Sequence, residues 1–168
     1  ITTPCNITGA GALSIFKQPA DATAGSSHAV LEFDSITSHS TVSGISIDGN
    51  AAGIPTGDIN NSEGINVKNC SNLHFFDIFA YNTISDGLDW DDSTDCSATN
   101  FVGVDCGGMA IHISTSNERI ISQDSSAIRC GLGSVLGVYN NRPGFDINTT
   151  STNCTISNCT SEACYRGV

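Results

Sequence analysis

The stretch that decides the fold is Gly64-Ile65-Asn66-Val67, because its pattern of glycine, apolar, polar and apolar residues returns along the chain. Successive returns are 23, 23, 34 and 23 residues apart, and an earlier block precedes Gly64 by 34. A fixed interval predicts stacked repeats, with eleven extra residues in each longer interval. The other blocks are Val30-Leu31-Glu32-Phe33-Asp34, Gly87-Leu88-Asp89-Trp90, Ala110-Ile111-His112-Ile113, Gly144-Phe145-Asp146-Ile147 and Gly167-Val168.

The periodicity within each block predicts strands rather than helices. β-Branched residues, glycine and asparagine recur in short runs separated by turn residues, so the chain is expected to be all-β. Three short strands per circuit, each paired in parallel with the circuit before, explain the return. The extra residues of the longer intervals are placed in two loop insertions, Ala51 to Asn61 and Gly133 to Pro143. Blocks such as Gly44-Ile45-Ser46-Ile47 and Phe101-Val102-Gly103-Val104 are expected to form another wall.

These features resemble the right-handed parallel β-helices of the pectin lyase-like superfamily. The resemblance lies in the stacked blocks, in Ser43-Gly44-Ile45-Ser46-Ile47-Asp48-Gly49-Asn50 and in Ile7-Thr8-Gly9-Ala10-Gly11. It implies a solenoid of about six coils with about 23 residues per coil. The superfamily includes polysaccharide lyases, polygalacturonase-like hydrolases, uronan epimerases, phage tailspikes and non-catalytic adhesins, so it leaves the function open.

Composition and the chain ends suggest an extracellular protein of one domain. A net charge of -11 makes nucleic acid a poor partner. No apolar run is long enough to predict a membrane span. The start at Ile1 suggests a mature or excised segment, and Gly167-Val168 would begin a further circuit. We therefore expect residues 1–168 to be one β-helix domain, a fragment or subunit of a longer solenoid or of a stacked assembly with head-to-tail self-association.

Cysteines and glycosylation motifs favour secretion. The chain has eight cysteines without the paired spacing of a zinc site, which favours disulfides in an oxidising compartment. Cys106, Cys130 and Cys164 recur near the repeat interval, so Cys106 could bridge to Cys130, or Cys130 to Cys164. Asn-x-Ser/Thr motifs predict N-glycans at Asn6, Asn60, Asn69, Asn148, Asn153 and Asn158.

The repeat register predicts the candidate site. Within each block the first and third residues after the glycine should face the core, so the second and fourth after it should face solvent and stack into two columns. Carboxylates that neighbour one another on such a face can supply an acid and a base for glycoside hydrolysis. The candidate catalytic residues are Asp86, Asp89, Asp91 and His112, and the candidate substrate-binding residues are Glu32, Asn66, Lys68 and Asp146.

Similarity to the polygalacturonase-like hydrolases implies a functional role for one residue. Asn82-Thr83-Ile84-Ser85-Asp86-Gly87 is similar to their Asn-Thr-Asp-Gly signature, with two residues inserted, which implies a role for Asp86. Gly107-Gly108-Met109 stands where they have a paired Asp-Asp, and their Gly-His-Gly and Arg-x-Lys signatures are missing. The lyases rely on a basic residue with calcium, and only Lys68 approaches the predicted groove.

Two functions remain open at this stage. One is a secreted enzyme that acts on or binds a polysaccharide, with a hydrolase favoured over a lyase or an epimerase. The other is a non-catalytic extracellular glycoprotein, an adhesin or a stacked fibre unit. No cofactor or metal is required by either. Calcium is an additional possibility, because hard cations take oxygen ligands and aspartates crowd at Asp86, Asp89, Asp91, Asp92 and Asp95.

Overall fold

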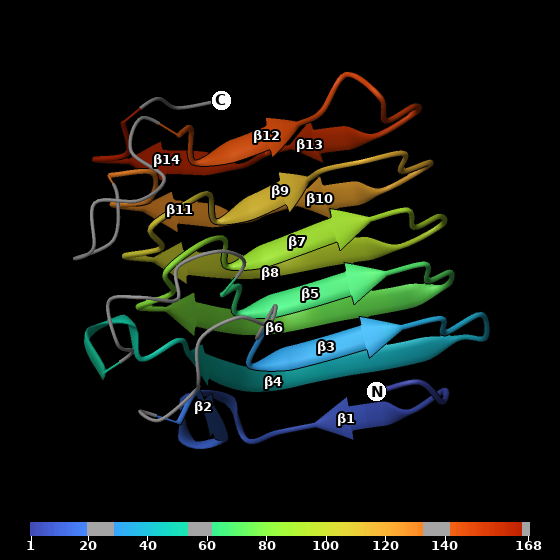
Figure 1. The fold of residues 1–168 in the computed structure, drawn as a ribbon, viewed down its shortest axis with the longest axis horizontal. Coiled ribbons are helices and arrows are strands. Elements are labelled where there is room, and N and C mark those ends of the chain that lie inside the picture. Colours follow the sequence, from blue (N-terminus) through green and yellow to red (C-terminus); the bar gives the residue numbers. More distant parts are fainter. Residues whose placement is uncertain (20–28, 54–61, 133–141, 166–168) are drawn as a thin grey trace.

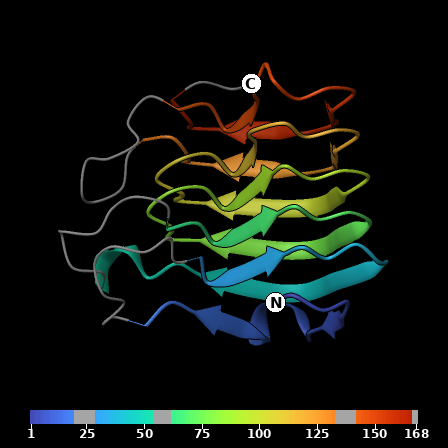
Figure 2. The ribbon, with the colours of Figure 1, turned by 45° about the vertical axis from the view of Figure 1, so that its right-hand side comes forward.

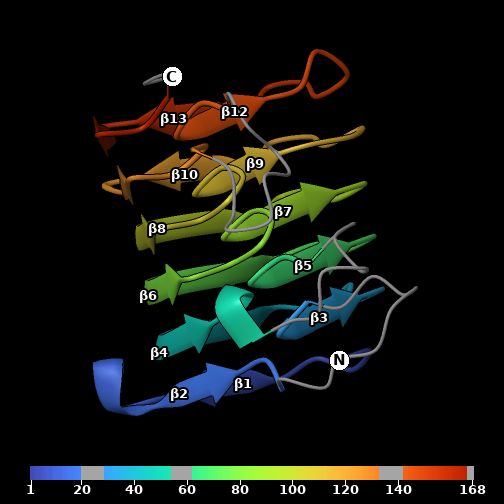
Figure 3. The same cartoon turned by 60° about the vertical axis from the view of Figure 1, so that its left-hand side comes forward.

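The computed structural model describes residues 1–19, 29–53, 62–132 and 142–165, which form strands and two short 3-10 helices, Gly11–Leu13 and Ala51–Gly53. The strands make two parallel sheets, one behind the other in Figure 1 and seen from other sides in Figures 2 and 3. The prediction of an all-β chain with parallel strands is therefore confirmed.

The five-stranded sheet carries the predicted repeat blocks. Its order is β12-β9-β7-β5-β3, so each strand pairs with the strand of the circuit before. The bounds are β3 (Leu31–Asp34), β5 (Ile65–Lys68), β7 (Leu88–Asp91), β9 (Ile111–Ile113) and β12 (Phe145–Ile147).

The nine-stranded sheet forms the other wall. Its central order is β1-β4-β6-β8-β10-β13, and β2, β11 and β14 pair at its side. Its strands are β1 (Asn6–Thr8), β2 (Ile15–Lys17), β4 (Ser40–Asp48), β6 (Leu73–Tyr81), β8 (Ser97–Val104), β10 (Ile121–Gln123), β11 (Ser126–Ile128), β13 (Thr155–Ser157) and β14 (Thr160–Glu162).

From β3 onward the chain alternates between the two sheets, and each return lays a new strand against the previous one (Figure 1). The predicted register is confirmed: Ile65 pairs with Leu88, and Leu88 pairs with Ile111. The core lies between the sheets, where Phe75 contacts Phe33 and Trp90 edge to face. Fully burying an aromatic or aliphatic side chain contributes about 1.5 to 3 kcal/mol, so this repeated core is the main source of stability.

Asparagine and aspartate form the corners of the nine-stranded sheet. Asp77, Asn100, Asp124 and Asn158 follow one another at equivalent positions and all have positive φ. Short polar side chains tolerate this left-handed conformation because they form local hydrogen bonds. The Asn100 side-chain amide, for example, donates to the Asp77 carboxylate at 2.6 Å. Much of the Asn and Asp content is thus a requirement of the fold.

The predicted cysteine column is present. The register of β8, β11 and β14 places Cys106, Cys130 and Cys164 above one another, and the Cys130 backbone N–H donates to Cys164 Sγ at 3.3 Å. All eight cysteines are free thiols in the structure, so disulfide formation stays a prediction. Asn60, Gly167-Val168 and most of the two predicted insertions lie outside the described residues.

Candidate active site

The predicted outward row is present on the five-stranded sheet. In the register Glu32 pairs with Asn66, Asp89 with His112, and His112 with Asp146. One expectation is corrected: Asn66 is only 3% exposed and does not face solvent. It stands between the side chains of Glu32 and Asp89 in the stack, and these neighbours on the same face help to cover it.

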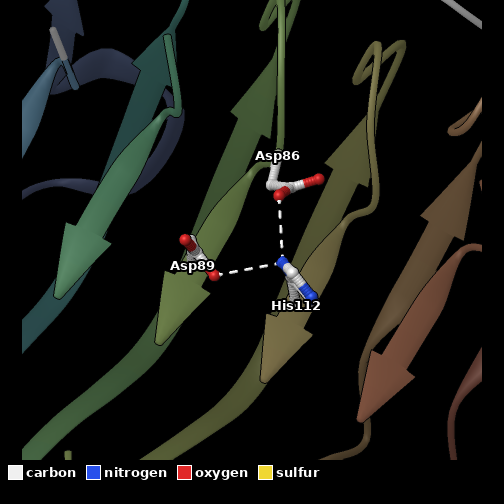
Figure 4. A group of neighbouring side chains, drawn as sticks. All are labelled: Asp86, Asp89 and His112. Carbon is white, nitrogen blue, oxygen red and sulfur yellow. Dashed lines mark ion pairs between the residues drawn. The ribbon is translucent and has the colours of Figure 1, made fainter. Parts of the chain in front are cut away.

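Asp86, Asp89 and His112 come together at the start of β7 and β9 (Figure 4). His112 Nδ1 lies 3.2 Å from Asp89 Oδ1 and 3.4 Å from Asp86 Oδ2. The three side chains are largely buried, with 17%, 9% and 18% of Asp89, Asp86 and His112 exposed. Two carboxylates therefore share one imidazole nitrogen in a partly dehydrated corner.

Asp86 is fixed by the next circuit of the chain. Its Oδ1 accepts a hydrogen bond of 2.6 Å from the Met109 backbone N–H. Gly108 makes room for this carboxylate, because a Cβ at residue 108 would lie 2.2 Å from Asp86 Oδ1. The departure from the paired-aspartate signature at Gly108 thus has a structural consequence: the space that a side chain would fill holds the carboxylate of Asp86.

Burial and neighbouring charges shift the pKa values of His112 and Asp89. Burial alone would lower the pKa of His112, but its contacts with Asp86 and Asp89 outweigh burial and raise that pKa to about 10. His112 is therefore an imidazolium at neutral pH. Burial raises the pKa of Asp89, and the charge of Asp86 raises it further, against the opposing contact with His112.

The remaining predicted residues lie around this cluster. Asp146 Oδ2 is 3.9 Å from His112 Nε2, on the opposite side of the ring from Asp89, and its side chain is exposed. Lys68 pairs with Glu32 at 3.9 Å. Asp91 lies two residues beyond Asp89, and its Oδ1 is 3.5 Å from Ser114 Oγ. Asp91 is thus near the cluster in sequence but does not contact His112 as Asp86 and Asp89 do.

Glu63 is a further acidic residue that sequence reasoning did not select. It precedes Gly64 as Asp86 precedes Gly87, and Gly64 N–H donates to the Asp86 carbonyl at 2.9 Å. Glu63 is 4% exposed, and burial raises the pKa of its carboxyl to about 7. The signal was available in the repeat: the residue before each glycine forms a column of its own.

Three buried acceptor atoms in this corner have no hydrogen-bond partner among the described residues: Glu63 Oε2, Asn66 Oδ1 and Asp89 Oδ1. Leaving a buried polar group unpaired costs about 1 to 3 kcal/mol, so such groups call for an explanation. Asp89 Oδ1 nevertheless lies 3.2 Å from His112 Nδ1, so the imidazolium is its ion-pair partner. The corner is rich in acceptors and poor in donors.

Asp86, Asp89 and His112 also approach the arrangement of a metal site, since one ligand atom from each lies within 4.8 Å of the others. A metal bound there would have to displace the Nδ1 proton of His112. The five aspartates considered for calcium do not gather: Asp95 pairs with Arg119 at 2.6 Å instead. Calcium binding stays a prediction without a defined ligand set.

A cavity of about 430 Å³ lies beside the turns that precede β7 and β9. Its polar lining includes the Lys17–Asp48 and Arg129–Asp105 ion pairs, together with Asn50. None of Asp86, Asp89 and His112 lines it. The candidate active site is therefore a face of the sheet rather than this cavity.

Comparisons with known proteins support the architecture. No protein-family model matches the chain, and no curated protein matches it. Among solved structures, the crystal structure of a "putative glycosyl hydrolase" from Parabacteroides merdae matches with a TM-score of 0.64 at 12% identity. The match covers 93% of this chain and 73% of that chain. At this identity the likeness concerns the fold. Among the described residues there is no helix long and apolar enough to span a membrane.

Proposed function

We propose that the chain is a right-handed parallel β-helix of about six coils, secreted from the cell, that binds and hydrolyses a polysaccharide. The glycan would lie across the strands of the five-stranded sheet, along the row from Glu32 to Asp146. The observation that carries this proposal is the Asp86–Asp89–His112 cluster, two carboxylates and an imidazolium on one face. The fold of the Parabacteroides merdae protein is consistent with it.

The environments of the residues suggest their roles. Glycoside hydrolysis needs one protonated carboxyl to give a proton to the leaving oxygen and one carboxylate to stabilise the oxocarbenium-like transition state. Asp89, whose pKa is raised by burial, suits the acid. Asp86, which accepts the Met109 N–H, suits the carboxylate. His112 would hold both in place, and Glu32, Lys68 and Asp146 would contact neighbouring sugars.

The spacing of the carboxylates favours retention of anomeric configuration. An oxygen of Asp86 and one of Asp89 lie within 4.8 Å of each other. Inverting enzymes hold their carboxyl groups about 6.5 to 9.5 Å apart to admit a water, whereas retaining enzymes hold them about 5 to 5.5 Å apart. We therefore expect the first sugar released to keep the configuration of the bond that was cut.

A polysaccharide panel tests the proposal. The purified chain is incubated with neutral, amino-sugar and uronate polymers, and new reducing ends are measured together with the anomer first formed, by proton NMR. We expect hydrolysis of at least one polymer with retention. Hydrolysis with inversion would overturn the assignment of Asp86 and Asp89 as the reacting pair. Unsaturated products would reveal a lyase instead.

A second function, a non-catalytic extracellular glycoprotein, is favoured by the position of the sequons. Asn6, Asn69, Asn153 and Asn158 are exposed. Asn158, however, donates from its side-chain amide to Asp124, and a glycan on the same nitrogen would remove a donor from that contact. Full occupancy at Asn69 and Asn148, measured by mass spectrometry, together with no hydrolysis of any polymer, would select this function. Filaments in sedimentation would further support head-to-tail self-association.

A further inference from the structure

Glu63 lies one circuit before Asp86 of the Asp86–Asp89–His112 cluster, at the equivalent position of the repeat. Because Ile65 pairs with Leu88 and Asn66 with Asp89, Glu63 has the same place relative to β5 as Asp86 has relative to β7. The backbone confirms this alignment: Gly64 N–H donates to the Asp86 carbonyl at 2.9 Å. Glu63 and Asn66 thus form the layer directly beneath Asp86 and Asp89.

The buried oxygens in these two layers could form a hydrogen bond with one another if one of them carried a proton. Glu63 Oε2 and Asn66 Oδ1 are buried acceptors without a hydrogen-bond partner among the described residues, and the buried Asp89 Oδ1 has only its ion-pair contact of 3.2 Å with His112 Nδ1. An O–H on Glu63 would supply the donor that this corner lacks. Of the two available acceptors, Asp89 is the stronger once it has lost its proton, because hydrogen bonds to charged acceptors are shorter and stronger than those to neutral ones.

The charges around Glu63 favour the protonated form. Asp86 and Asp89 act on it from the next circuit, and both disfavour a further negative charge. Lys68, on its own strand, is the cation that acts on Glu63, but it is already 3.9 Å from Glu32. An ionised Glu63 would be a third carboxylate in a corner with one imidazolium.

We propose that Glu63 is a positioning residue of the site, a neutral carboxylic acid whose O–H donates a hydrogen bond to the buried oxygen of Asp89. This bond would fix the Asp89 side chain against β5 and stabilise its negative charge after it has given its proton to the leaving group. Burial, which raises the pKa of Glu63 to about 7, keeps the acid neutral in weakly acidic solution. The catalytic consequence rests on the proposed function, whereas the protonation of Glu63 does not.

Two variants separate a hydrogen-bonding role from a packing role. Glu63→Gln keeps the size and a permanent N–H donor, whereas Glu63→Met keeps much of the volume and removes the donor. On a hydrolysed polymer we expect Glu63→Gln to retain activity near pH 6 and to lose the decline above pH 7 that ionisation of Glu63 produces. Near pH 6 Glu63→Met should lose at least about tenfold in kcat, since a positioned proton or hydrogen bond contributes about that much or more. This loss should shrink above pH 7, where Glu63 of the unmodified chain is ionised.

A measurement without substrate tests the protonation itself. The free energy of unfolding is compared for the unmodified chain, Glu63→Gln and the exposed control Glu162→Gln from pH 4 to 9. The loss or gain in stability caused by Glu63→Gln, relative to that caused by Glu162→Gln, should grow between pH 4.5 and about pH 7, the ordinary and raised pKa of Glu63. A difference independent of pH would overturn the proposal even if the chain hydrolyses a glycan. If the stability difference grows with pH but no polymer is hydrolysed, only the proposed function is contradicted.

Discussion

The same repeat stacks two sets of charged side chains, but one set is half exposed and the other is largely buried. On the turns that flank the nine-stranded sheet, Arg129 meets Asp105 of the circuit before through two hydrogen bonds of 2.7 and 2.6 Å, with about half of each side chain exposed. At the edge of the five-stranded sheet, His112 meets two carboxylates, and all three side chains are largely buried.

The difference shows which charges form ordinary surface ion pairs and which are available for chemistry. The Arg129–Asp105 pair is matched one to one and open to water, so it contributes little to stability and perturbs little else. The His112 corner has more carboxylates than cations and unpaired buried oxygens, and its pKa values shift. Perturbed groups of this kind concentrate at functional sites.

The largest expected effect is that of His112→Asn. Removing the cation leaves Asp86 and Asp89 buried and facing each other, which costs about 3 to 5 kcal/mol when a buried pair is broken. Hydrolysis should fall at least about 100-fold, because His112 holds both the acid and the carboxylate in place. Because the pKa of His112 is raised to about 10, its stabilising contribution is fully present below pH 6.5 and is lost as the pH rises through 10. Chemical unfolding at several pH values measures this, and equal losses at pH 6 and pH 10.5 would contradict it.

The second-largest expected effect is a gain in stability, in the variant Glu63→Gln. Glu63→Gln removes a carboxyl whose pKa is raised from 4.5 to about 7, a difference that corresponds to about 3 kcal/mol. The penalty in the unmodified chain is absent below pH 4.5, grows as the pH rises towards 7 and is constant above it. At pH 8 the variant should therefore be more stable by up to that amount. Urea unfolding at pH 4 and pH 8 checks the sign, and a loss at pH 8 would count against a neutral Glu63.

A smaller effect is expected for Gly108→Ala. The new Cβ would lie 2.2 Å from Asp86 Oδ1, so the carboxylate must leave the Met109 N–H. Losing that hydrogen bond in a buried place costs about 1 to 3 kcal/mol. Hydrolysis should fall together with stability. A Gly108→Ala variant with unchanged activity would show that the position of Asp86 is unimportant.

The smallest effect belongs to the exposed pair. Arg129→Gln should change stability within the error of an unfolding measurement and should leave hydrolysis unchanged, because solvent and salt screen the pair. Thermal unfolding at low and high salt checks this. A loss comparable to that of His112→Asn would remove the distinction between the two sets of charges.

The repeat allowed most of the fold to be predicted. Glycine and alternating apolar residues at a fixed interval require Ile65, Leu88 and Ile111 to stack, and they do. The corner residues were visible in the sequence as asparagine and aspartate, but nothing local distinguishes a left-handed corner such as Asp77 from a solvent-facing aspartate such as Asp91. That distinction depends on how neighbouring circuits pair.

The candidate site was predictable as a column and not as a cluster. The register placed Asp89 beside His112, and the turn motif had already selected Asp86. The contact of Asp86 with His112 and the separate contact of Asp91 with Ser114 depend on side-chain direction. Glu63 was missed because an isolated glutamate before a glycine has no motif. Its burial, which shifts its pKa, arises only when the circuits are assembled.

The central claim is that Asp89, held by His112, reacts with a glycan and that Asp91 does not. The most direct measurement compares Asp89→Asn with Asp91→Asn on the polymer that the unmodified chain hydrolyses best. The account predicts a loss of at least about 100-fold in kcat for Asp89→Asn and less than about threefold for Asp91→Asn, with both variants folded. Equal losses, or full activity in Asp89→Asn, would contradict it.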